Sequence, residues 1–160
     1  MYWFIGTRKG YEKGINTYIM TMVSREPRQI LGFEVGTSVN VGQIQKIVDS
    51  TYNASNYYTD GCPVYQAVDF FKGKLIQNIN DKSDTYIIEG TNADIRHYVA
   101  GFRRKSRCFF RKEETLKVVL CIFIDAYNKF GEAKYNFFKE RPYLNPKYYR
   151  EFKFSLIDFL

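Results

Sequence analysis

The feature of this sequence that most constrains its fold is a change in the spacing of apolar residues near Asn40. Before that point, three segments rich in aromatic and β-branched residues are bounded by Gly, Asn or Pro, which is typical of short strands. We predict these strands over 2–7, 17–23 and 29–35, with Pro27 in the turn between the last two. Short connections join neighbouring antiparallel strands, so the first third of the chain is expected to form an antiparallel meander.

After Asn40, helical and extended spacings alternate. We predict, in chain order, a helix over 41–52, a strand over 56–59, a helix that begins at Pro63, a strand over 75–79, a long helix after Ile88 and an apolar helix over 114–129. Three antiparallel strands followed by alternating strands and helices is the element order of a ribonuclease-H-like fold. The predicted fold class is therefore α/β, with a mixed sheet of three antiparallel strands and then parallel strands, flanked by helices.

The length of 160 residues corresponds to a single domain of ordinary size. We expect residues 1–130 to form the α/β core. Residues 131–160 are expected to form a tail of helix, turn and docked terminal segment, because Pro142 and Pro146 interrupt that stretch. Aromatic residues make up 18% of the chain, which excludes an unfolded polymer.

The charge and the cysteines narrow the class of partner and the compartment. Lys and Arg number 24 against 17 Asp and Glu, so the net charge is +7 and favours a polyanionic partner. Cys62, Cys108 and Cys121 are odd in number and far apart, which indicates neither a disulfide framework nor a zinc knuckle and fits a reducing cytoplasm. The longest apolar run, Val118 to Ile124, is far shorter than the roughly 20 residues of a bilayer span, so no membrane partner is expected.

Asp60 follows a predicted buried strand and precedes Gly61 and the helix that begins at Pro63. In open α/β sheets ligands gather at the carboxyl ends of strands, so this carboxylate is a candidate for binding or catalysis. The alternative is that Asp60 caps the following helix, which is a common role of aspartate. Its position alone does not separate the two interpretations.

Three polar residues share one face of the long helix predicted after Ile88. Glu89 lies at the start, and Asn92 and Arg96 follow three and seven residues later, opposite an apolar stripe. A carboxylate, an amide and a guanidinium on one face could hold a metal ion and steer a phosphodiester, since Mg²⁺ takes hard oxygen ligands and Arg binds phosphate bidentately. The alternative is an ordinary solvated face with a favourable acidic residue at the helix start.

A basic cluster follows the same helix. Six positive residues occupy a ten-residue window: Arg103, Arg104, Lys105, Arg107, Arg111 and Lys112. Such a cluster suits contacts with a phosphate backbone, which carry no sequence information. The alternative is a charged loop that faces solvent.

Other common chemistries find no support in the sequence. His97 is the only histidine, so no histidine-based metal cluster or catalytic dyad can be assembled from this chain alone. No Walker loop, Gly-x-Gly-x-x-Gly, Gly-x-Ser-x-Gly or helical zinc motif occurs. This removes the common nucleotide-binding, hydrolase and metalloprotease classes.

Two segments of the sequence together resemble transposases of the bacterial insertion-sequence-one type. The first resembles the second-aspartate region of that family: Thr59, Asp60, Gly61, Pro63, Val64 and Tyr65, followed by Lys72, Gly73, Lys74 and Leu75. The second resembles the family's glutamate helix and the basic stretch after it: Glu89, Asn92, Arg96, Ala100, Arg104, Lys105, Ser106 and Phe109. The resemblance extends over roughly residues 1–128.

The resemblance implies a transposase of the DDE superfamily, which carries out DNA transposition and recombination with a ribonuclease-H-like core. In that superfamily two aspartates and a glutamate bind two divalent ions, Mg²⁺ or Mn²⁺, for in-line attack on a phosphodiester. By the resemblance, Asp60 is the second aspartate and Glu89 is the glutamate, and both are metal ligands. Asn92 and Arg96 would contact DNA or support the site, and residues 103–112 would hold the double-stranded DNA of transposon ends and target.

The sequence departs from the family pattern at its amino terminus. Family members place an Asp-Glu pair on the first strand, immediately before the residues that correspond to Met1 and Tyr2, and this chain begins there. Glu12 and Glu34 are poor geometric substitutes, and the family's zinc-binding and helix-turn-helix segments are absent as well. We therefore expect the first catalytic aspartate to be missing. The isolated chain would then be an inactive fragment, a remnant, or a piece started at an internal methionine.

Three functional hypotheses follow. The first is a transposase catalytic core that is truncated. The second is a non-catalytic basic module that binds DNA or RNA, or that associates with another copy or with a full-length transposase as an inhibitor. The third is a nuclease that cleaves the RNA strand of a hybrid, which also needs the missing carboxylate. Replacing Asp60 or Glu89 with alanine should abolish function under the first hypothesis and leave binding intact under the second.

Overall fold

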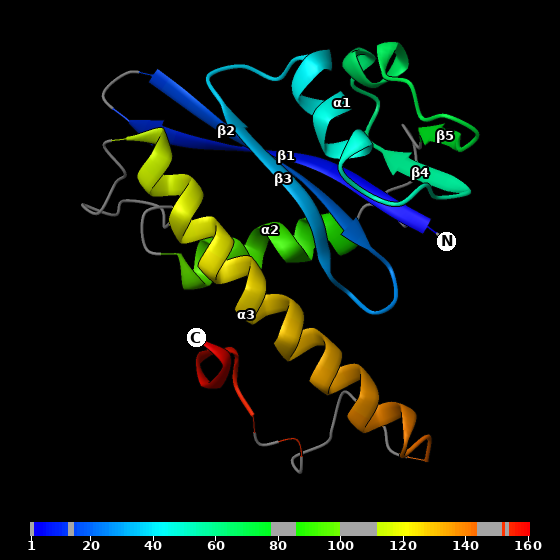
Figure 1. Cartoon of the computed structure of the whole chain (residues 1–160), viewed down its shortest axis with the longest axis vertical. Coiled ribbons are helices and arrows are strands. Elements are labelled where there is room, and N and C mark those ends of the chain that lie inside the picture. Colours follow the sequence, from blue (N-terminus) through cyan, green and yellow to red (C-terminus); the bar gives the residue numbers. More distant parts are fainter. Residues whose placement is uncertain (1, 13–14, 78–85, 100–111, 144–151, 153) are drawn as a thin grey trace.

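The computed structural model of the chain describes residues 2–12, 15–77, 86–99, 112–143, 152 and 154–160. The strands in these ranges are β1 (Tyr2–Glu12), β2 (Ile15–Ser24), β3 (Ile30–Gly36), β4 (Asn56–Thr59) and β5 (Lys74–Gln77). The helices are α1 (Val41–Asp49), α2 (Tyr86–Tyr98) and α3 (Glu113–Lys139), with short 3₁₀ helices η1 (Pro63–Ala67) and η3 (Leu156–Phe159). Figure 1 shows how these elements are arranged.

The five strands form one mixed sheet in the order β3-β2-β1-β4-β5. β2 pairs antiparallel with both β1 and β3, which confirms the predicted meander. β4 lies parallel to β1, and β5 lies parallel to β4. The sheet therefore changes from antiparallel to parallel pairing at β1, and β4 lies between β1 and β5.

β1 and β2 are longer than the sequence predicts. The prediction ends the first strand at residue 7 and begins the second at residue 17, whereas the ladder continues from Trp3 with Ser24 to Glu12 with Ile15. Hydrogen bonding to a partner strand stabilises extended backbone even where the local residues prefer a turn. Residues 8–12 and 15–16, which the prediction left between the two strands, are therefore part of the hairpin.

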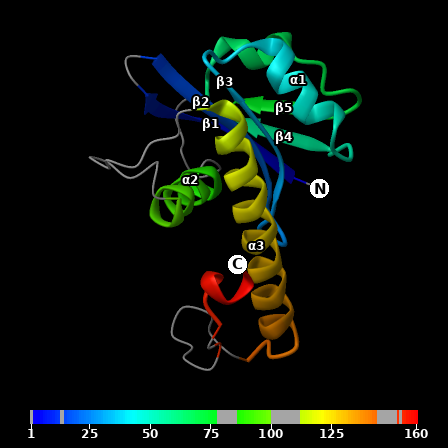
Figure 2. The ribbon, with the colours of Figure 1, turned by 60° about the vertical axis from the view of Figure 1, so that its left-hand side comes forward.

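Helices cover both faces of the sheet, and the alternation of side chains along β2 divides the core between them. Met20 and Met22 pack with Ile44 and other residues of α1 on one face. Ile19 and Val23 pack with α2 and α3 on the other face. Figure 1 and Figure 2 show α1 on one side of the sheet and α2 with α3 on the opposite side. The result is a layer of strands between two layers of helices.

The α1 helix begins as the sequence predicts but ends earlier than residue 52. Asn40 is the N-cap, and its side chain accepts a hydrogen bond from the Gln43 backbone N–H at 3.0 Å. The hydroxyls of Ser50 and Thr51 donate to the Ile47 carbonyl, which would otherwise accept a bond from the next helical turn. These hydroxyls satisfy the end of the helix at Asp49.

The helix predicted to begin at Pro63 is a short 3₁₀ segment. In a longer helix the spacing of Val64, Val68 and Phe71 would bury Phe71, but Phe71 is exposed, with a positive φ of 55°, and Phe70 is buried instead. The Asp69 side chain accepts a hydrogen bond from the Phe71 backbone N–H at 2.7 Å. This turn stops the helix and directs Phe70 into the core beneath α1.

The α3 helix has 27 residues and continues ten residues beyond the predicted end at 129. It runs through Gly131, the first residue of the predicted tail, and ends shortly before Pro142. Because of this length, its second half extends past the sheet, as Figure 2 shows. None of the helices in the described ranges has the length and apolar character needed to span a bilayer.

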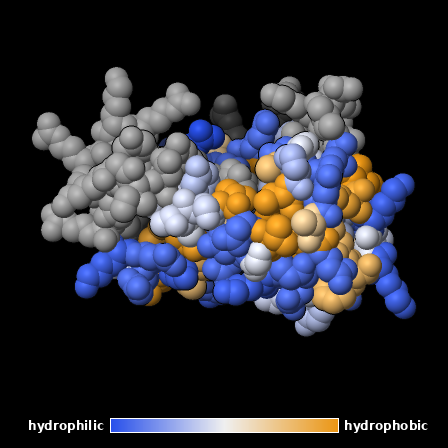
Figure 3. Space-filling view, turned by 90° about the horizontal axis from the view of Figure 1, so that it is seen from above, coloured by the Kyte–Doolittle hydropathy of each residue, from blue (hydrophilic) through white to orange (hydrophobic). Residues whose placement is uncertain are grey.

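The described end of the chain lies against the second half of α3. The ring of Phe130 on α3 lies 5.8 Å from that of Phe152 and 6.0 Å from that of Phe159. Leu156 of η3 is buried in the same core as α2 and α3. At the opposite end of the molecule, where α1 and η1 lie, apolar and hydrophilic side chains are interspersed over the described surface (Figure 3).

Candidate functional site

Asp60 lies directly after β4 and is exposed. Its Oδ1 atom accepts a hydrogen bond from the Cys62 backbone N–H at 3.1 Å, and its carbonyl oxygen accepts one from Gln77 Nε2 at 3.1 Å. The N-cap of η1 is Cys62, so Asp60 does not cap η1 directly. Its side chain instead closes the tight turn that leads into η1.

Tyr65 of η1 supports this turn from the core side. Its side chain is fully buried. Burial raises the pKa of Tyr65 well above its usual range, and the nearby Asp60 carboxylate raises it further. The phenol therefore stays protonated at neutral pH.

The register of β1 determines which residues could join Asp60. β1 pairs with β4 from Tyr2 opposite Asn56 to Phe4 opposite Tyr58. Two residues beyond Phe4 is Gly6, which is the β1 position nearest in register to Asp60. The only carboxylate within β1 is Glu12, about 20 Å further along at roughly 3.3 Å per residue.

The same register bears on the aspartate that the resemblance places just before Met1. Such a residue would continue β1 beside the chain that precedes Asn56, at the opposite end of β4 from Asp60. At roughly 3.3 Å per residue, it would lie on the order of 20 Å from the position beside Asp60. The family pattern and the register of this structure therefore place the first carboxylate differently.

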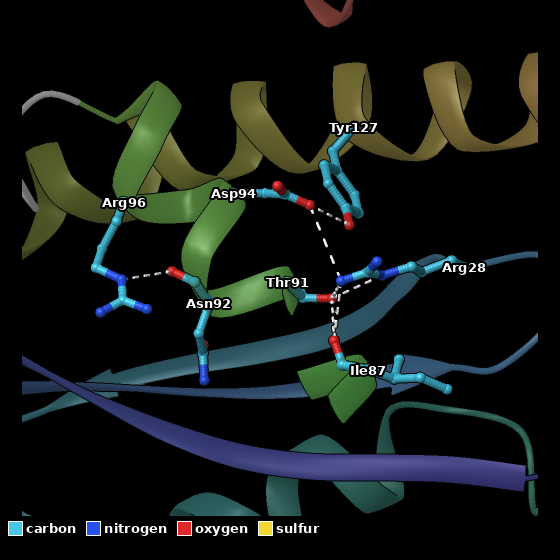
Figure 4. Close-up of polar contacts among 7 residues, drawn as sticks. All are labelled: Arg28, Ile87, Thr91, Asn92, Asp94, Arg96 and Tyr127. Atoms are coloured by element: carbon cyan, nitrogen blue, oxygen red, sulfur yellow. Dashed lines mark hydrogen bonds and ion pairs between the residues drawn. The ribbon is translucent and has the colours of Figure 1, made fainter. Parts of the chain in front are cut away.

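The α2 helix begins two residues before Ile88 and carries the other predicted site residues. Glu89 is exposed in its first turn, where a negative charge interacts favourably with the helix dipole. Asn92 and Arg96 are half-buried, and Arg96 Nε donates to the Asn92 carbonyl oxygen at 3.3 Å (Figure 4). Ile95, three residues after Asn92 and fully buried, borders this polar face. The predicted polar face is thus present, but it is less solvated than an ordinary surface face.

Most of the predicted basic cluster falls outside the described residues. The structure does not describe five of its six residues: Arg103, Arg104, Lys105, Arg107 and Arg111. Lys112 is described: it is exposed and immediately precedes α3. Contact between residues 103–112 and DNA stays a prediction.

The described residues do not fit the two-ion centre that the resemblance implies. No group of three or more His, Cys, Asp and Glu side chains that could hold an ion comes together among them. Two-metal sites hold ions roughly 3.5–4 Å apart, which requires several carboxylate oxygens in one place. Asp60 follows β4 and Glu89 lies on α2, and the β1 position beside Asp60 is Gly6, which carries no carboxylate.

A polar network that the sequence analysis missed joins the β2–β3 connection to α2 and α3 (Figure 4). Arg28 Nη2 donates to the Ile87 carbonyl at 3.0 Å, and Nε and Nη2 lie 3.3 and 3.2 Å from Thr91 Oγ1. Asp94 Oδ2 lies 3.9 Å from Arg28 Nη2 and accepts a hydrogen bond from the Tyr127 hydroxyl at 3.1 Å. These five residues are called the Arg28 clasp below.

Two glycines inside helices make room for the clasp. A Cβ atom at Gly131 of α3 would lie 2.9 Å from the Arg28 carbonyl oxygen, and a Cβ atom at Gly90 of α2 would collide with the Arg28 guanidinium. The side chain can move, whereas the carbonyl is part of the backbone, so Gly131 is the stricter requirement. Glycine in a helix interior costs about 1 kcal/mol relative to alanine, so a glycine inside a predicted helix indicates a close contact at that position. It does not indicate that Arg28 is the residue in contact.

Burial raises the pKa of Tyr127 from 10.0 to about 12, although the positive charge of Arg28 opposes part of this shift. The hydroxyl therefore remains a hydrogen-bond donor to Asp94 at neutral pH. Arg28 and Asp94 are each 39% exposed at the side chain, so their ion pair is partly screened by water. The Arg28 clasp is suited to joining the β2–β3 connection, α2 and α3.

Asn128 makes a second link between α3 and the sheet. Its Oδ1 accepts from the Ile30 N–H at 2.8 Å, and its Nδ2 donates to the Ile30 carbonyl at 2.9 Å. The amide thus pairs with the edge strand β3 as another strand would. The start of β3 is consequently covered by a side chain from α3.

Comparison with known proteins identifies the fold. No protein-family model matches this sequence, and no curated protein sequence matches it. Among solved structures, the chain is similar to a chain of the simian T-cell lymphotropic virus intasome in complex with the PP2A regulatory subunit B56 gamma. That match has a TM-score of 0.50 and 11% identity and covers 90% of this chain and 43% of that chain. The chain thus spans less than half the length of that relative.

A second similar structure is the catalytic core domain of BIV integrase. The TM-score is 0.50 and the identity is 14%, over 63% of this chain and 70% of that chain. The fold is ribonuclease-H-like. Identities this low show the fold alone, so the chemistry of this chain has to be argued from its own residues.

Proposed function

We propose that this chain is a DNA-binding ribonuclease-H-like core of the strand-transfer class, which binds DNA without completing the transfer reaction. The observation that carries this proposal is the placement of Asp60 directly after β4 and of Glu89 in the first turn of α2, on a fold similar to an integrase catalytic core. These two residues would be the remaining catalytic carboxylates. In the described part of β1 the position beside Asp60 is Gly6, which has no side chain to bind a metal ion, and this argues against a complete transfer reaction.

The finer identity that we propose is a core of the insertion-sequence-one type of DNA transposase. The residues that surround Asp60 and Glu89 carry that resemblance. In an intact family member the two carboxylates would hold two divalent ions, Mg²⁺ or Mn²⁺, together with the first aspartate. In this chain Gly6 occupies the β1 position beside Asp60, so we propose that binding is the function of this core.

The proposed ligand is double-stranded DNA. The net charge of +7 favours a polyanion, and the six cations of residues 103–112 follow the helix that carries Arg96. Association with another copy or with a full-length transposase would let such a chain occupy transposon ends and inhibit transposition. Gly6 at the β1 position beside Asp60 favours this regulatory role over catalysis.

Duplex binding tests the proposal. We expect the full chain to bind a labelled DNA duplex in fluorescence anisotropy with a steep salt dependence, because each neutralised phosphate contributes about 0.9 to the log–log slope. Replacing Arg103, Arg104, Lys105 and Arg107 with serine should lower that slope by about 3.6. Asp60→Ala and Glu89→Ala should leave duplex affinity unchanged. Binding that does not depend on salt, or that is insensitive to the four serines, would contradict the proposal.

A further inference from the structure

A groove of about 700 Å³ lies between the β2–β3 connection and the second half of α3. Residues 25–28 and 127–142 form most of its walls, and neither Asp60 nor Glu89 lines it. Its volume is within the roughly 300–1,000 Å³ of typical ligand sites. Figure 1 shows this part of α3 below the sheet, whereas β4 lies at the upper right.

The walls of the groove are positively charged. Arg25, Arg28, Lys134 and Lys139 line it, together with two carboxylates, one of which is Asp94. Asp94 is already engaged, because it accepts the Tyr127 hydrogen bond and lies 3.9 Å from Arg28 Nη2. Four cations against two carboxylates leave a net positive wall that complements an anionic ligand.

Aromatic surface lies beside these cations. The side chain of Tyr135 is 39% exposed, and Lys139 Nζ lies 5.9 Å from the centre of its ring. Phe138, half-buried, lines the same groove. Exposed rings next to cations are the arrangement that binds unpaired nucleotides, since bases stack on rings while phosphates contact Lys and Arg.

An extended peptide fits the groove less well. Peptides commonly bind by adding a strand to the edge of a sheet, and β3 is the edge strand nearest the groove. The backbone N–H and carbonyl of Ile30, at the start of β3, are already paired with the Asn128 side chain. The main-chain contacts that a peptide would use there are occupied.

We propose that this groove binds a single-stranded nucleic-acid segment, with a base against Tyr135 and phosphates on Lys134, Lys139 and Arg25. The proposal rests on the proposed DNA-binding function and adds the state of the DNA: unpaired nucleotides, such as a strand that extends beyond a duplex. The groove and the 103–112 cluster would then contact different parts of one DNA molecule.

The test is fluorescence anisotropy with a blunt DNA duplex and with the same duplex carrying a single-stranded overhang. The full chain should bind the overhang probe more tightly. Tyr135→Ala should lower overhang affinity about tenfold and leave blunt-duplex affinity unchanged, whereas Tyr135→Phe should retain both, because it keeps the stacking ring. Equal effects of Tyr135→Ala on the two probes, or no effect on either, would overturn the proposal.

The charge contribution is tested by a matched pair of double variants on α3. Lys134→Glu with Lys139→Glu changes two groove lysines, whereas Lys117→Glu with Lys129→Glu changes two lysines outside the groove that pair with acidic residues four positions earlier. The groove pair should weaken overhang binding about tenfold more than the control pair. It should also lower the salt slope by about 1.4, at roughly 0.7 per single-strand phosphate.

The outcomes separate this proposal from the proposed function. Equal losses in the two double variants overturn the groove site, while salt-dependent duplex binding by the same chain still supports the proposed function. A synthetic peptide rich in Glu and Tyr tests for a protein partner. If the groove variants abolish binding of this peptide and leave overhang binding unchanged, the groove site for nucleic acid is overturned in favour of a protein partner. Failure of the unmodified chain to bind either probe would contradict both proposals.

Discussion

The motif region at the end of β4 and the start of α2 differs from the Arg28 clasp in how its residues are held. Asp60 and Glu89 are exposed, and Asp60 forms hydrogen bonds within its own turn and with Gln77 on the neighbouring β5. Arg28, in contrast, contacts residues 59 and 63 positions away in α2. The region that carries the recognisable chemistry is therefore held locally, whereas the region without any motif joins three elements.

This difference indicates that fold and chemistry depend on separate residues in this chain. Removing the charges of the motif region should disturb binding and stability little, whereas small changes at the clasp should disturb the packing of α2 and α3 on the sheet.

The largest effect is expected from Gly131→Val. The new side chain would begin 2.9 Å from the Arg28 carbonyl oxygen, so α3 and the β2–β3 connection must move apart. We expect the free energy of unfolding to fall by about 3 kcal/mol, the upper part of the range for overpacking. Gly42→Val is the matched control, since the nearest atom to its Cβ position is 3.5 Å away. Equal stability of the two variants in chemical denaturation would show that the clasp does not hold α3.

Asn128→Ala removes both hydrogen bonds to Ile30. We expect a loss of about 2 kcal/mol, at roughly 1 kcal/mol for each hydrogen bond, and faster hydrogen exchange at the Ile30 amide. Asn136→Ala, at an exposed position on the same helix, should cost less than about 0.5 kcal/mol. If the two alanine variants are equally stable, the amide does not bind the edge of β3.

Alkaline pH should weaken the clasp through Tyr127. Its pKa is raised by burial from 10.0 to about 12, so the folded state favours the neutral phenol. The associated stability is complete below pH 10 and is lost as the pH rises through 12, with about 1 kcal/mol lost near pH 11. Tyr127→Phe should show a smaller decline between these pH values. An identical decline in the variant would contradict the assigned shift.

The smallest effect is expected in the motif region. Asp60→Asn retains the acceptor for the Cys62 N–H, and Glu89→Gln changes an exposed side chain. Each should alter the free energy of unfolding by less than about 0.5 kcal/mol. Carboxylates crowded into an assembled metal centre repel one another without their ions. A gain of more than about 1 kcal/mol in the double variant would therefore indicate that the two carboxylates lie together.

The sequence predicts the elements whose apolar spacing is regular and local. The antiparallel meander, the start of α1 at its Asn40 cap and the strand β4 follow from such patterns. The length of β1 and the passage of α3 through Gly131 do not, because each depends on a partner distant in sequence. Phe71 shows the same limit, since the turn at Asp69 reverses which of two neighbouring rings is buried.

The candidate site is predictable only in part. The sequence places Asp60 after a strand and Glu89 at a helix start, and the structure has both arrangements. Which residue of β1 lies beside Asp60 depends on strand register, which spacing does not fix. The groove along α3 was not predicted either, because its cations and rings come from a turn and a helix about 100 residues apart in sequence.

The most direct test of the central claim is an assay of strand cleavage and joining by the full 160-residue chain, with labelled duplex DNA and either Mg²⁺ or Mn²⁺. We expect the chain to bind the duplex and to yield no cleaved or joined product with either ion. Product that requires the ion and disappears in both Asp60→Ala and Glu89→Ala would contradict the claim that this chain binds DNA without processing it.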